Sequence, residues 1–429
     1  MIQRERPVVS ELISDTFVPR MFKVGQSFPR PRIDASDIPA HIHSMLSEEK
    51  FASQIRPGME IAITCGSRGV ANVAVITKSI VDFVKSRGAV PFIVPAMGSH
   101  GGATAEGQRA VIESYGVTEE AMGCEIRSSM ETVKIGCNEE GVDVYIDRNA
   151  ANADGIIVSC RVKPHTSFRG KYESGIMKMM TIGLGKQHGA EQCHESGFKH
   201  MAKNVLLFGR TILKNAPVLF AVAAIENAYD ETARLVAVNA DEVEAVEPGL
   251  LQEAAGNMAR ILVDSCDVLI VDSIGKNFSG DGMDPNVTGT FCTPYASGGL
   301  SAQRVCVLDL SPETHGNACG IGMASATTKR AYEKMDLAPM YCNAITSTVL
   351  TVVRIPLIME SDKEAIQVCI KSCNEIDKSR PRIVRIKNSM NLDEIWLSEA
   401  YLDEIKETEG LTVLSEPEFL PFDDNGDLW

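Results

Sequence analysis

Apolar and polar positions in the first half of the chain alternate between two periods. Short apolar runs at 61–65, 90–94 and 155–160 are rich in β-branched residues and are followed by glycine, proline or charged residues, which is typical of buried strands. Between the first two runs, apolar residues recur at helical spacing over 73–84, and Gly88 ends that pattern. The same criteria predict strands at 142–146 and 218–225, and helices at 104–115 and 189–213.

This alternation of strands and helices predicts an α/β fold with a mainly parallel sheet covered by helices. A chain of 429 residues is too long for one ordinary core, so we expect two such domains with the active-site cleft between them. An acidic, loop-like stretch at 226–250 is the expected boundary, and beyond it a helix at 251–263 and strands at 267–271 and 305–310 are predicted. The predicted domains are 1–250 and 251–395, with an acidic tail at 396–429 that packs on them.

Glycines and polar residues directly follow the predicted strands. The loops at 66–69, 98–102 and 161–165 come after three strands of the first domain, and ligands of open parallel sheets bind at the carboxyl ends of the strands. We therefore expect these loops to converge. In the second domain, Lys276 and His315 follow two strands in the same way and are expected to face the first domain and to contact the substrate.

Charge excludes some classes of partner. The formal net charge is −15 and no run of lysine and arginine is present, which argues against nucleic acid and against an anionic membrane. No apolar run reaches the length of a membrane span, and no signal peptide is recognised. The 12 cysteines contain no CxxC pair, so we expect reduced thiols in a cytoplasmic protein.

Three residues are candidates for chemistry. His100 lies in Gly98-Ser-His-Gly-Gly, where glycines let the backbone approach a ligand closely, and His165 follows the rigid Pro164 after a strand. Imidazole exchanges protons near neutral pH, so we interpret both histidines as functional. Lys178 is a single cation among apolar residues, where a lysine either extends to water or becomes a nucleophile or covalent anchor.

Other features carry weaker signals. His188, Cys193, His194 and His200 lack the spacing of a zinc site, so one of them as a single metal ligand is the better hypothesis. Ser67 and Gly69 lie in a short glycine loop that could hold a phosphate at the start of the next helix.

With these residues in place, the chain resembles the nickel-dependent lactate racemases and related 2-hydroxyacid racemases and epimerases. Gly98-Ser99-His100 is similar to the turn of the family's first catalytic histidine, and Pro164-His165 to the second. Lys178 stands five residues before a glycine, like the lysine that tethers the cofactor, and His194 follows it by sixteen positions, like the nickel-binding histidine. Arg68 matches an arginine of the first phosphate- or substrate-contacting loop.

The resemblance implies a cytoplasmic isomerase that uses a nickel pincer nucleotide, a Ni(II) pyridinium-3-thioamide-5-thiocarboxylic acid mononucleotide made by dedicated biosynthetic enzymes. The cofactor's ring carbon would accept a hydride from the hydroxyl-bearing carbon of a small 2-hydroxy acid and return it on the other face. His100 and His165 would exchange the hydroxyl proton. Arg68 or Lys276 would hold the substrate carboxylate.

Two departures indicate a divergent branch. The family has a glycine run before the tethering lysine, whereas Glu173-Ser-Gly-Ile-Met177 stands here, so Lys171 and Lys186 remain alternatives. The first loop lacks the family's Asp-x-Thr-Arg-Pro pattern, which leaves the substrate open. Alternatives from other classes are a zinc-dependent hydrolase or lyase and a non-catalytic nucleotide-binding homologue. The oligomeric state does not follow from the sequence.

Overall fold

The chain folds into two compact units in the computed structural model, which describes residues 7–67 and 69–429. One unit is Pro29–Met258, and the other joins the described residues up to Phe28 to Ala259–Trp429. The N-terminal segment belongs with the second unit because its strand β1 (Met21–Gln26) pairs with two strands from the end of the chain. The expected domain limits and the cleft between the domains stay predictions.

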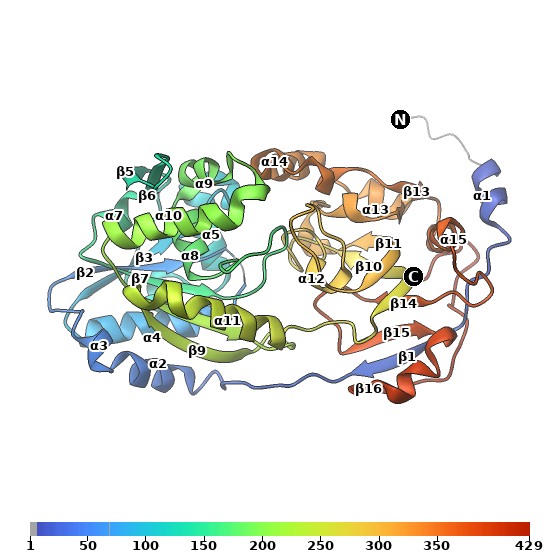
Figure 1. Ribbon diagram of the computed structural model, residues 1–429, viewed down its shortest axis with the longest axis horizontal. Coiled ribbons are helices and arrows are strands. Elements are labelled where there is room, and N and C mark those ends of the chain that lie inside the picture. The colour runs from blue at the N-terminus through green and yellow to red at the C-terminus, as the bar shows by residue number, and fades with distance from the viewer. Residues whose placement is uncertain (1–6, 68) are drawn as a thin grey trace. The chain divides into compact units, whose positions relative to one another are not determined.

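The Pro29–Met258 unit is built on a six-stranded sheet in the order β4-β3-β2-β7-β8-β9 (Figure 1). All neighbours pair in parallel except β8 and β9, which confirms the mainly parallel sheet expected here. The strands of this unit are β2 (Glu60–Cys65), β3 (Val90–Pro95), β4 (Glu125–Ile126), β5 (Thr132–Cys137), β6 (Asp143–Asp147), β7 (Gly155–Arg161), β8 (Val218–Glu226) and β9 (Thr232–Asn239). Its α-helices are α2 (Ile38–Leu46), α3 (Glu49–Ala52), α4 (Val73–Ser86), α5 (Ala105–Ser114), α6 (Glu119–Met122), α7 (Arg148–Ala151), α8 (Ile176–Lys178), α9 (Lys186–His194), α10 (Met201–Asn215) and α11 (Val243–Asn257).

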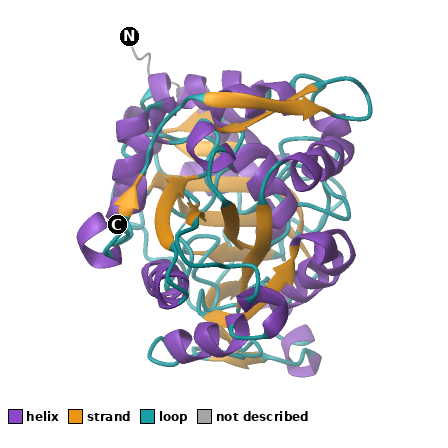
Figure 2. Ribbon diagram, turned by 90° about the vertical axis from the view of Figure 1, so that its left-hand side faces the viewer, coloured by secondary structure: helices purple, strands orange, loops and turns teal. Residues whose placement is uncertain are grey.

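Helices cover both faces of this sheet (Figure 2). Alternate residues of β2 point to opposite faces, so Ala62 joins the core under α8, α10 and α11 while Ile61 and Ile63 join the core under α2 and α4. With both faces buried, the strands read as continuous apolar runs, which is why they could be predicted from the sequence.

Four predicted elements differ from the structure. The helix predicted at 251–263 is the second half of α11, which ends at Asn257 and belongs to the Pro29–Met258 unit. The run at 142–146 forms β6, but β6 pairs antiparallel with β5 in a separate two-stranded sheet and does not join the main sheet. The stretch 226–250 is not a loop, because it contains β9 and the first half of α11. The helix predicted at 189–213 is two helices, α9 and α10, with Gly197 at a φ of +76° between them.

The second unit contains an eight-stranded sheet in the order β13-β12-β11-β10-β14-β15-β1-β16. Its first five strands are parallel and the remaining pairs are antiparallel. Besides β1, its strands are β10 (Ser265–Ile274), β11 (Ser301–Leu310), β12 (Ala326–Thr328), β13 (Leu357–Met359), β14 (Ile383–Ile386), β15 (Glu394–Ser398) and β16 (Leu411–Val413). Its α-helices are α1 (Pro7–Ile13), α12 (Pro285–Thr288), α13 (Lys329–Glu333), α14 (Leu337–Ser347) and α15 (Asp362–Ser372).

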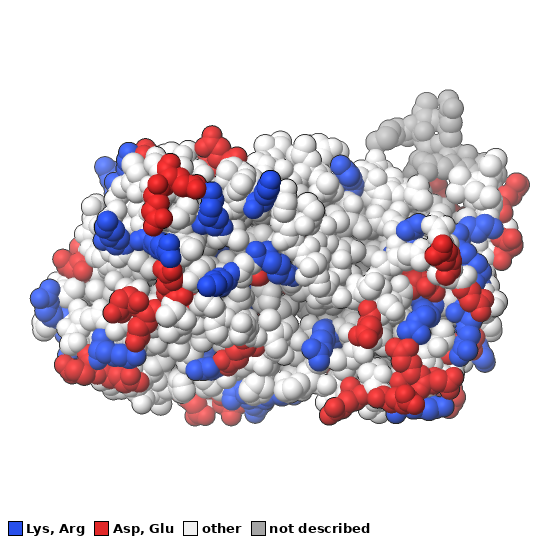
Figure 3. All heavy atoms as spheres, viewed as in Figure 1, with Lys and Arg blue, Asp and Glu red and all other residues white. Residues whose placement is uncertain are grey.

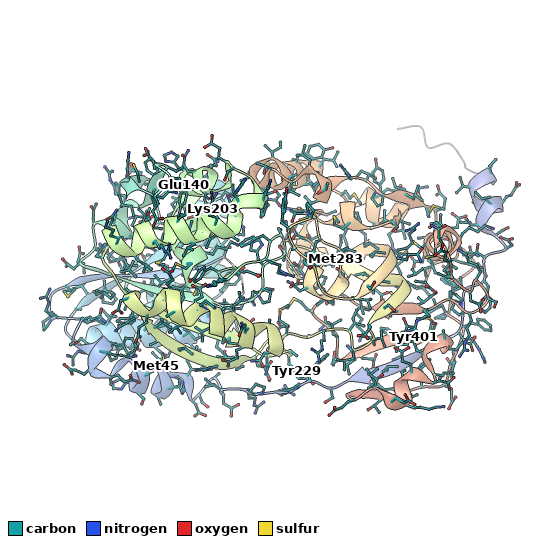
Figure 4. The ribbon with its side chains drawn as sticks, viewed as in Figure 1. Met45, Glu140, Lys203, Tyr229, Met283 and Tyr401 are labelled. Atoms are coloured by element: carbon teal, nitrogen blue, oxygen red, sulfur yellow. The ribbon has the colours of Figure 1, made fainter. Side chains whose placement is uncertain are left out.

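The core of the second unit includes Met283 and Tyr401, both buried (Figure 4). The Tyr401 hydroxyl donates a hydrogen bond of 2.6 Å to the carbonyl of Ser265, so this polar group is satisfied inside the core. Each of the 12 cysteines lies in the described part of the chain and is a free thiol. No helix among the described residues is both long and apolar enough to cross a membrane.

Acidic and basic side chains are interspersed on the face of the molecule drawn in Figure 3. On the Pro29–Met258 unit, Lys203 of α10 pairs with Glu140 at 2.7 Å, and the two side chains lie next to one another in Figure 4. Such exposed pairs contribute little to stability, so this surface gives no argument about a partner.

Candidate active site

The candidate site lies at the carboxyl edge of the Pro29–Met258 sheet. Strands β3, β2 and β7 are neighbours and run parallel, so the segments that follow them leave the sheet at the same edge. Two of the three predicted loops are in direct contact there, because the Oγ atom of Ser67 lies 2.5 Å from Nδ1 of His100. The expected convergence of these two loops is therefore present in the structure.

The backbone around His100 is fixed by a buried glutamine. Gln108 of α5 is fully buried, and its side-chain amide donates to the carbonyls of Gly98 and His100 at 2.8 and 3.3 Å. Gly98 has a φ of +62°, and its N–H donates to the carbonyl of Gly183 at 3.2 Å. The backbone of the loop is held in this way while the imidazole of His100 is exposed.

The loop that carries Ser67 is also held at both ends. The Tyr115 hydroxyl donates to the carbonyl of Ser67 at 2.6 Å. Glu226, at the end of β8, accepts the N–H of Ala71 at 2.6 Å and pairs with Arg161. Gly69 is exposed and Arg68 lies outside the described residues, so the phosphate-binding role of this loop stays a prediction.

A buried carboxylate organises the segment around His165. Glu173 is 5% exposed and accepts the N–H groups of His165 and Gly170 at 2.7 and 3.0 Å. The N–H of Ser167 donates to Nδ1 of His165 at 3.0 Å, and the imidazole packs on Phe168 with ring centroids 4.4 Å apart. A nitrogen that accepts a hydrogen bond carries no proton, so this His165 ring is neutral with its proton on Nε2.

Lys178 ends the short helix α8 and is followed by a π-helical turn at Met179–Gly183, a rare conformation that is frequent at functional sites. The lysine is half-buried. Burial raises the pKa of the Cys193 thiol to about 12, and the charge of Lys178 acts in the opposite direction. Burial lowers the pKa of His194, with Lys178 as a further cause. Both effects place Lys178 in the neighbourhood of Cys193 and His194.

His194 is the candidate for a single metal ligand. Its Nδ1 lies 2.7 Å from the carbonyl of Ala190, and because a carbonyl only accepts, Nδ1 carries the proton and Nε2 keeps its lone pair. The carbonyl of Ala190 thus fixes the tautomer of His194, as partners of this kind do for histidines that bind metals, and the sequence could not identify it. The lowered pKa also keeps the ring neutral, as metal binding requires. One neutral nitrogen near a lysine therefore fits the nickel pincer nucleotide.

An aromatic side chain connects His194 with His165. The ring of Phe198 lies 5.7 Å from His194 and 6.3 Å from His165, measured between centroids. The structure thus brings Lys178, His194 and His165 into one neighbourhood, and joins His100 to Ser67.

The four residues weighed for zinc do not gather. His188 packs on Tyr145 with ring centroids 4.3 Å apart, and the buried thiol of Cys193 lies 3.9 Å from the sulfur of Met201. Within 7–67 and 69–429, no group of three or more His, Cys, Asp or Glu side chains is placed to hold a metal ion.

The three candidate lysines differ in exposure. Lys171 is exposed, Lys178 is half-buried and Lys186 is fully buried. The ammonium of Lys186 lies 3.3 Å from Asp147 and donates to the carbonyl of Pro95. A buried ammonium with these partners is not accessible for covalent attachment, which argues against Lys186 as the tether.

Lys276 and His315 lie in the other unit, in the loops that follow the neighbouring parallel strands β10 and β11. The N–H of Lys276 donates to the Thr314 hydroxyl at 3.0 Å, so the two loops are in contact. The Lys276 ammonium donates to the carbonyl of Gly280 at 2.5 Å, and His315 is exposed with a φ of +48°. Their role with the substrate stays a prediction.

Sequence reasoning missed several residues that hold this site, namely Gln108, Glu173, Phe198 and Glu247. Glu247 of α11 is 1% exposed, and its Oε2 accepts the N–H of Met177, directly before Lys178, at 2.9 Å. Its other carboxylate oxygen has no hydrogen-bond partner among the described residues. Buried carboxylates that bond to distant backbone groups leave no spacing pattern in the sequence. The one available signal was that Glu173 and Glu247 are charged residues among apolar neighbours.

The chain is similar to several known proteins. Residues 24–205 match the model of the lactate racemase N-terminal domain. A crystal structure of a protein from Thermotoga maritima is 11% identical with a TM-score of 0.53, over 85% of this chain and 99% of that one. The lactate racemase apoprotein from Thermoanaerobacterium thermosaccharolyticum is 12% identical with a TM-score of 0.48, over 86% of this chain and 94% of that one. No curated protein sequence matches significantly.

At these identities the Thermotoga maritima structure supports the α/β fold alone, and the domain match concerns residues 24–205. His100, His165, Lys178 and His194 all lie inside the matched region. Residues 24–205 of this chain are therefore similar to the lactate racemase N-terminal domain.

Proposed function

We propose that this protein is a racemase or epimerase that inverts the hydroxyl-bearing carbon of a small 2-hydroxy acid with a lysine-tethered nickel pincer nucleotide. The observation that carries the proposal is the neighbourhood of Lys178, His194 and His165 inside a lactate racemase N-terminal domain. With Lys178 as the covalent tether and His194 as the metal ligand, the cofactor would be anchored at two points.

The residues assigned to the cofactor follow from their surroundings. Lys178 is the tether, because it is half-buried beside His194 while Lys186 is enclosed. His194 provides Nε2 to nickel, a metal that imidazole suits. Ser67 and Gly69 contribute to the loop for the nucleotide phosphate, together with Arg68. When bound, the cofactor supplies a ring carbon that accepts a hydride and returns it.

His100 and His165 handle the proton of the substrate hydroxyl. The Ser67 hydroxyl either donates to Nδ1 of His100 or accepts from it, so Nε2 of His100 is able to alternate between base and acid. His165 is different because its Nδ1 accepts the N–H of Ser167, which leaves Nε2–H as a hydrogen-bond donor to a substrate oxygen. For His165 to take a proton at Nε2, its ring must first exchange the bond to Ser167. The two histidines are therefore unequal in their resting states.

The substrate carboxylate needs a cation. We assign this role to Arg68 or Lys276, each of which would form a charge-assisted hydrogen bond with it. A hydroxy acid held by its carboxylate presents its hydroxyl to a histidine in a fixed orientation, and such orientation is a large part of the rate of a bound reaction.

The decisive experiment is to produce the protein together with the enzymes that make the cofactor. Intact and peptide mass spectrometry is expected to find the added mass on the peptide that contains Lys178, and metal analysis is expected to find nickel. The Lys178→Ala variant should lose the mass, while the control Lys171→Ala should keep it.

Activity is then measured on a panel of 2-hydroxy acids, unlabelled and deuterated at the hydroxyl-bearing carbon, with chiral chromatography. Inversion is expected with retention of most of the deuterium on carbon, because the hydride does not exchange with water. No added mass on any lysine peptide, together with no nickel, would rule the proposal out. Stoichiometric zinc that survives Lys178→Ala would favour a zinc enzyme instead.

A further inference from the structure

Lys186 is an unusual residue for a folded protein. Its side chain is fully buried, and its backbone has a φ of +54°, which residues other than glycine rarely adopt. Burial lowers the pKa of its ammonium, and the neighbouring Asp147 carboxylate, also fully buried, acts against that shift. The chain thus buries a charge in a segment with a strained backbone. Both features cost stability, and they are retained at positions where the residue has a function.

The contacts of Lys186 lead to the His100 loop. Its ammonium donates to the carbonyl of Pro95, the last residue of β3, and to Oε1 of Gln108 at 3.0 Å. The other end of the Gln108 amide donates to the carbonyls of Gly98 and His100. One buried glutamine therefore connects the lysine with the backbone of the histidine.

The chemistry of the lysine fixes the direction of the glutamine amide. An ammonium has donors only, so the amide oxygen of Gln108 has to face Lys186. The amide NH2 then has to face the two carbonyls of the loop. Without the lysine the amide is able to turn over, and its oxygen would face two carbonyl oxygens.

We propose that Lys186 and Gln108 are positioning residues for His100. Lys186 holds the amide of Gln108 in one orientation, and the amide holds the backbone that presents the imidazole to Ser67. The segment that begins at Lys178 continues to Lys186, so this connection also ties the histidine loop to the segment of the proposed tether. The inference rests on the proposed function for its catalytic meaning, but its structural core is testable in the protein without cofactor.

The first variant is Gln108→Glu, which keeps an oxygen acceptor for Lys186 and removes the NH2 donor. The matched control is Gln367→Glu, because Gln367 is also a buried helical glutamine that donates to a backbone carbonyl, that of Thr16 in the other unit. Amide hydrogen exchange is expected to become about tenfold faster or more at His100 and Ala103 in Gln108→Glu, and to stay unchanged there in the control.

Side-chain ¹⁵N NMR gives a second readout without cofactor. The signals of the His100 imidazole are expected to shift in Gln108→Glu as the contact with Ser67 loosens, while those of His165 stay in place. In the loaded enzyme, kcat is expected to fall about tenfold or more with KM changed by less than about twofold, because the geometry of a reacting group is altered and substrate binding is not.

The second variant replaces the ion pair as a whole, since Lys186→Met alone would leave Asp147 buried without its partner and could unfold the chain. Lys186→Met combined with Asp147→Asn is expected to reproduce the exchange and NMR changes of Gln108→Glu. Adding Gln108→Leu to that pair is expected to cause little further change, because the residues act in series.

The proposal is overturned if Gln108→Glu leaves both the exchange rates and the His100 signals as in the parent protein. It is also overturned if the cofactor mass maps to the Lys186 peptide. A protein that never takes up cofactor or nickel would contradict the proposed function only, since the exchange and NMR readouts decide the positioning role by themselves.

Discussion

The Oγ atom of Ser67 lies 2.5 Å from Nδ1 of His100, although the two residues come from loops that follow different strands. A bond to Nδ1 orients an imidazole, and the direction of that bond decides which nitrogen is protonated. Ser67 is itself fixed through its carbonyl, which accepts the hydroxyl of Tyr115. The orientation of His100 is therefore determined by the loop after β2 as well as by its own loop.

Replacing Ser67 by alanine is expected to release the His100 ring. We predict that Ser67→Ala changes the ratio of the two neutral tautomers of His100, measured by ¹⁵N NMR, and lowers kcat of the loaded enzyme by about tenfold, since one hydrogen bond in a reacting geometry is lost. The control is Ser86→Ala, whose hydroxyl donates to the carbonyl of Phe83 at the end of α4. Equal effects of the two substitutions would contradict a specific role of Ser67.

A second prediction concerns the resting state of His165. Because the N–H of Ser167 donates to Nδ1, the ¹⁵N spectrum near neutral pH is expected to show the Nε2–H tautomer for His165. For His194 the opposite tautomer is expected, since its Nδ1 donates to the carbonyl of Ala190. The signals are assigned with His165→Gln and His194→Gln. The same tautomer for both rings would be inconsistent with these bonds.

The sequence predicts the edge of the sheet at which the site forms, and physical reasons explain why. Buried parallel strands are continuous apolar runs, and consecutive βαβ units place their following loops at one edge, so the order of the residues alone indicates that Ser67 and His100 lie close together. The ends of β2, β3 and β7 differ from the predicted ones by one residue at most.

What holds those loops could not be predicted in this way. Gln108 and Glu173 bond to backbone carbonyl and N–H groups, and such bonds depend on tertiary packing and not on spacing along the chain. The prediction of a loop at 226–250 is wrong because the burial pattern of β9 is irregular. In β9 only every third residue from Thr232, namely Leu235 and Val238, is buried, so the strand has no strict alternation to recognise.

Glu247 gives a prediction about pH. Burial raises the pKa of Glu247 to about 7, although the N–H groups of Met177 and Ile176 lower it. Between pH 4.5 and about 7 the folded protein therefore keeps the proton of Glu247, whereas the unfolded chain has already released it. Its contribution to the free energy of unfolding is complete below pH 4.5 and is lost as pH rises through about 7.

Glu247→Gln removes this titration. The free energy of unfolding of the variant minus that of the parent is therefore expected to rise by roughly 3 kcal/mol between pH 4 and pH 8, apart from a constant offset. Denaturation of parent and variant at several pH values, monitored by hydrogen exchange in α11, measures this difference in the free energy of unfolding. The control is Glu253→Gln on the same helix, where the carboxylate pairs with Arg234 at the surface. A difference between parent and Glu247→Gln that does not vary with pH would show that Glu247 ionises as an ordinary carboxylate.

The last prediction separates the two anchors proposed for the cofactor. In protein produced with the biosynthetic enzymes, His194→Ala is expected to keep the added mass on the Lys178 peptide and to lose most of its nickel, whereas Lys178→Ala loses both. The control is His188→Ala, because His188 packs on Tyr145 and belongs to no group of metal-ligating side chains among the described residues.

Since burial lowers the pKa of His194, its nitrogen stays neutral below the ordinary pKa of 6.5, and nickel should be retained on acidification past that pH. The nickel content of the protein, measured at successively lower pH values, tests this retention. Release of nickel centred at or above pH 6.5, or unchanged nickel in His194→Ala, would mean that another residue holds the metal.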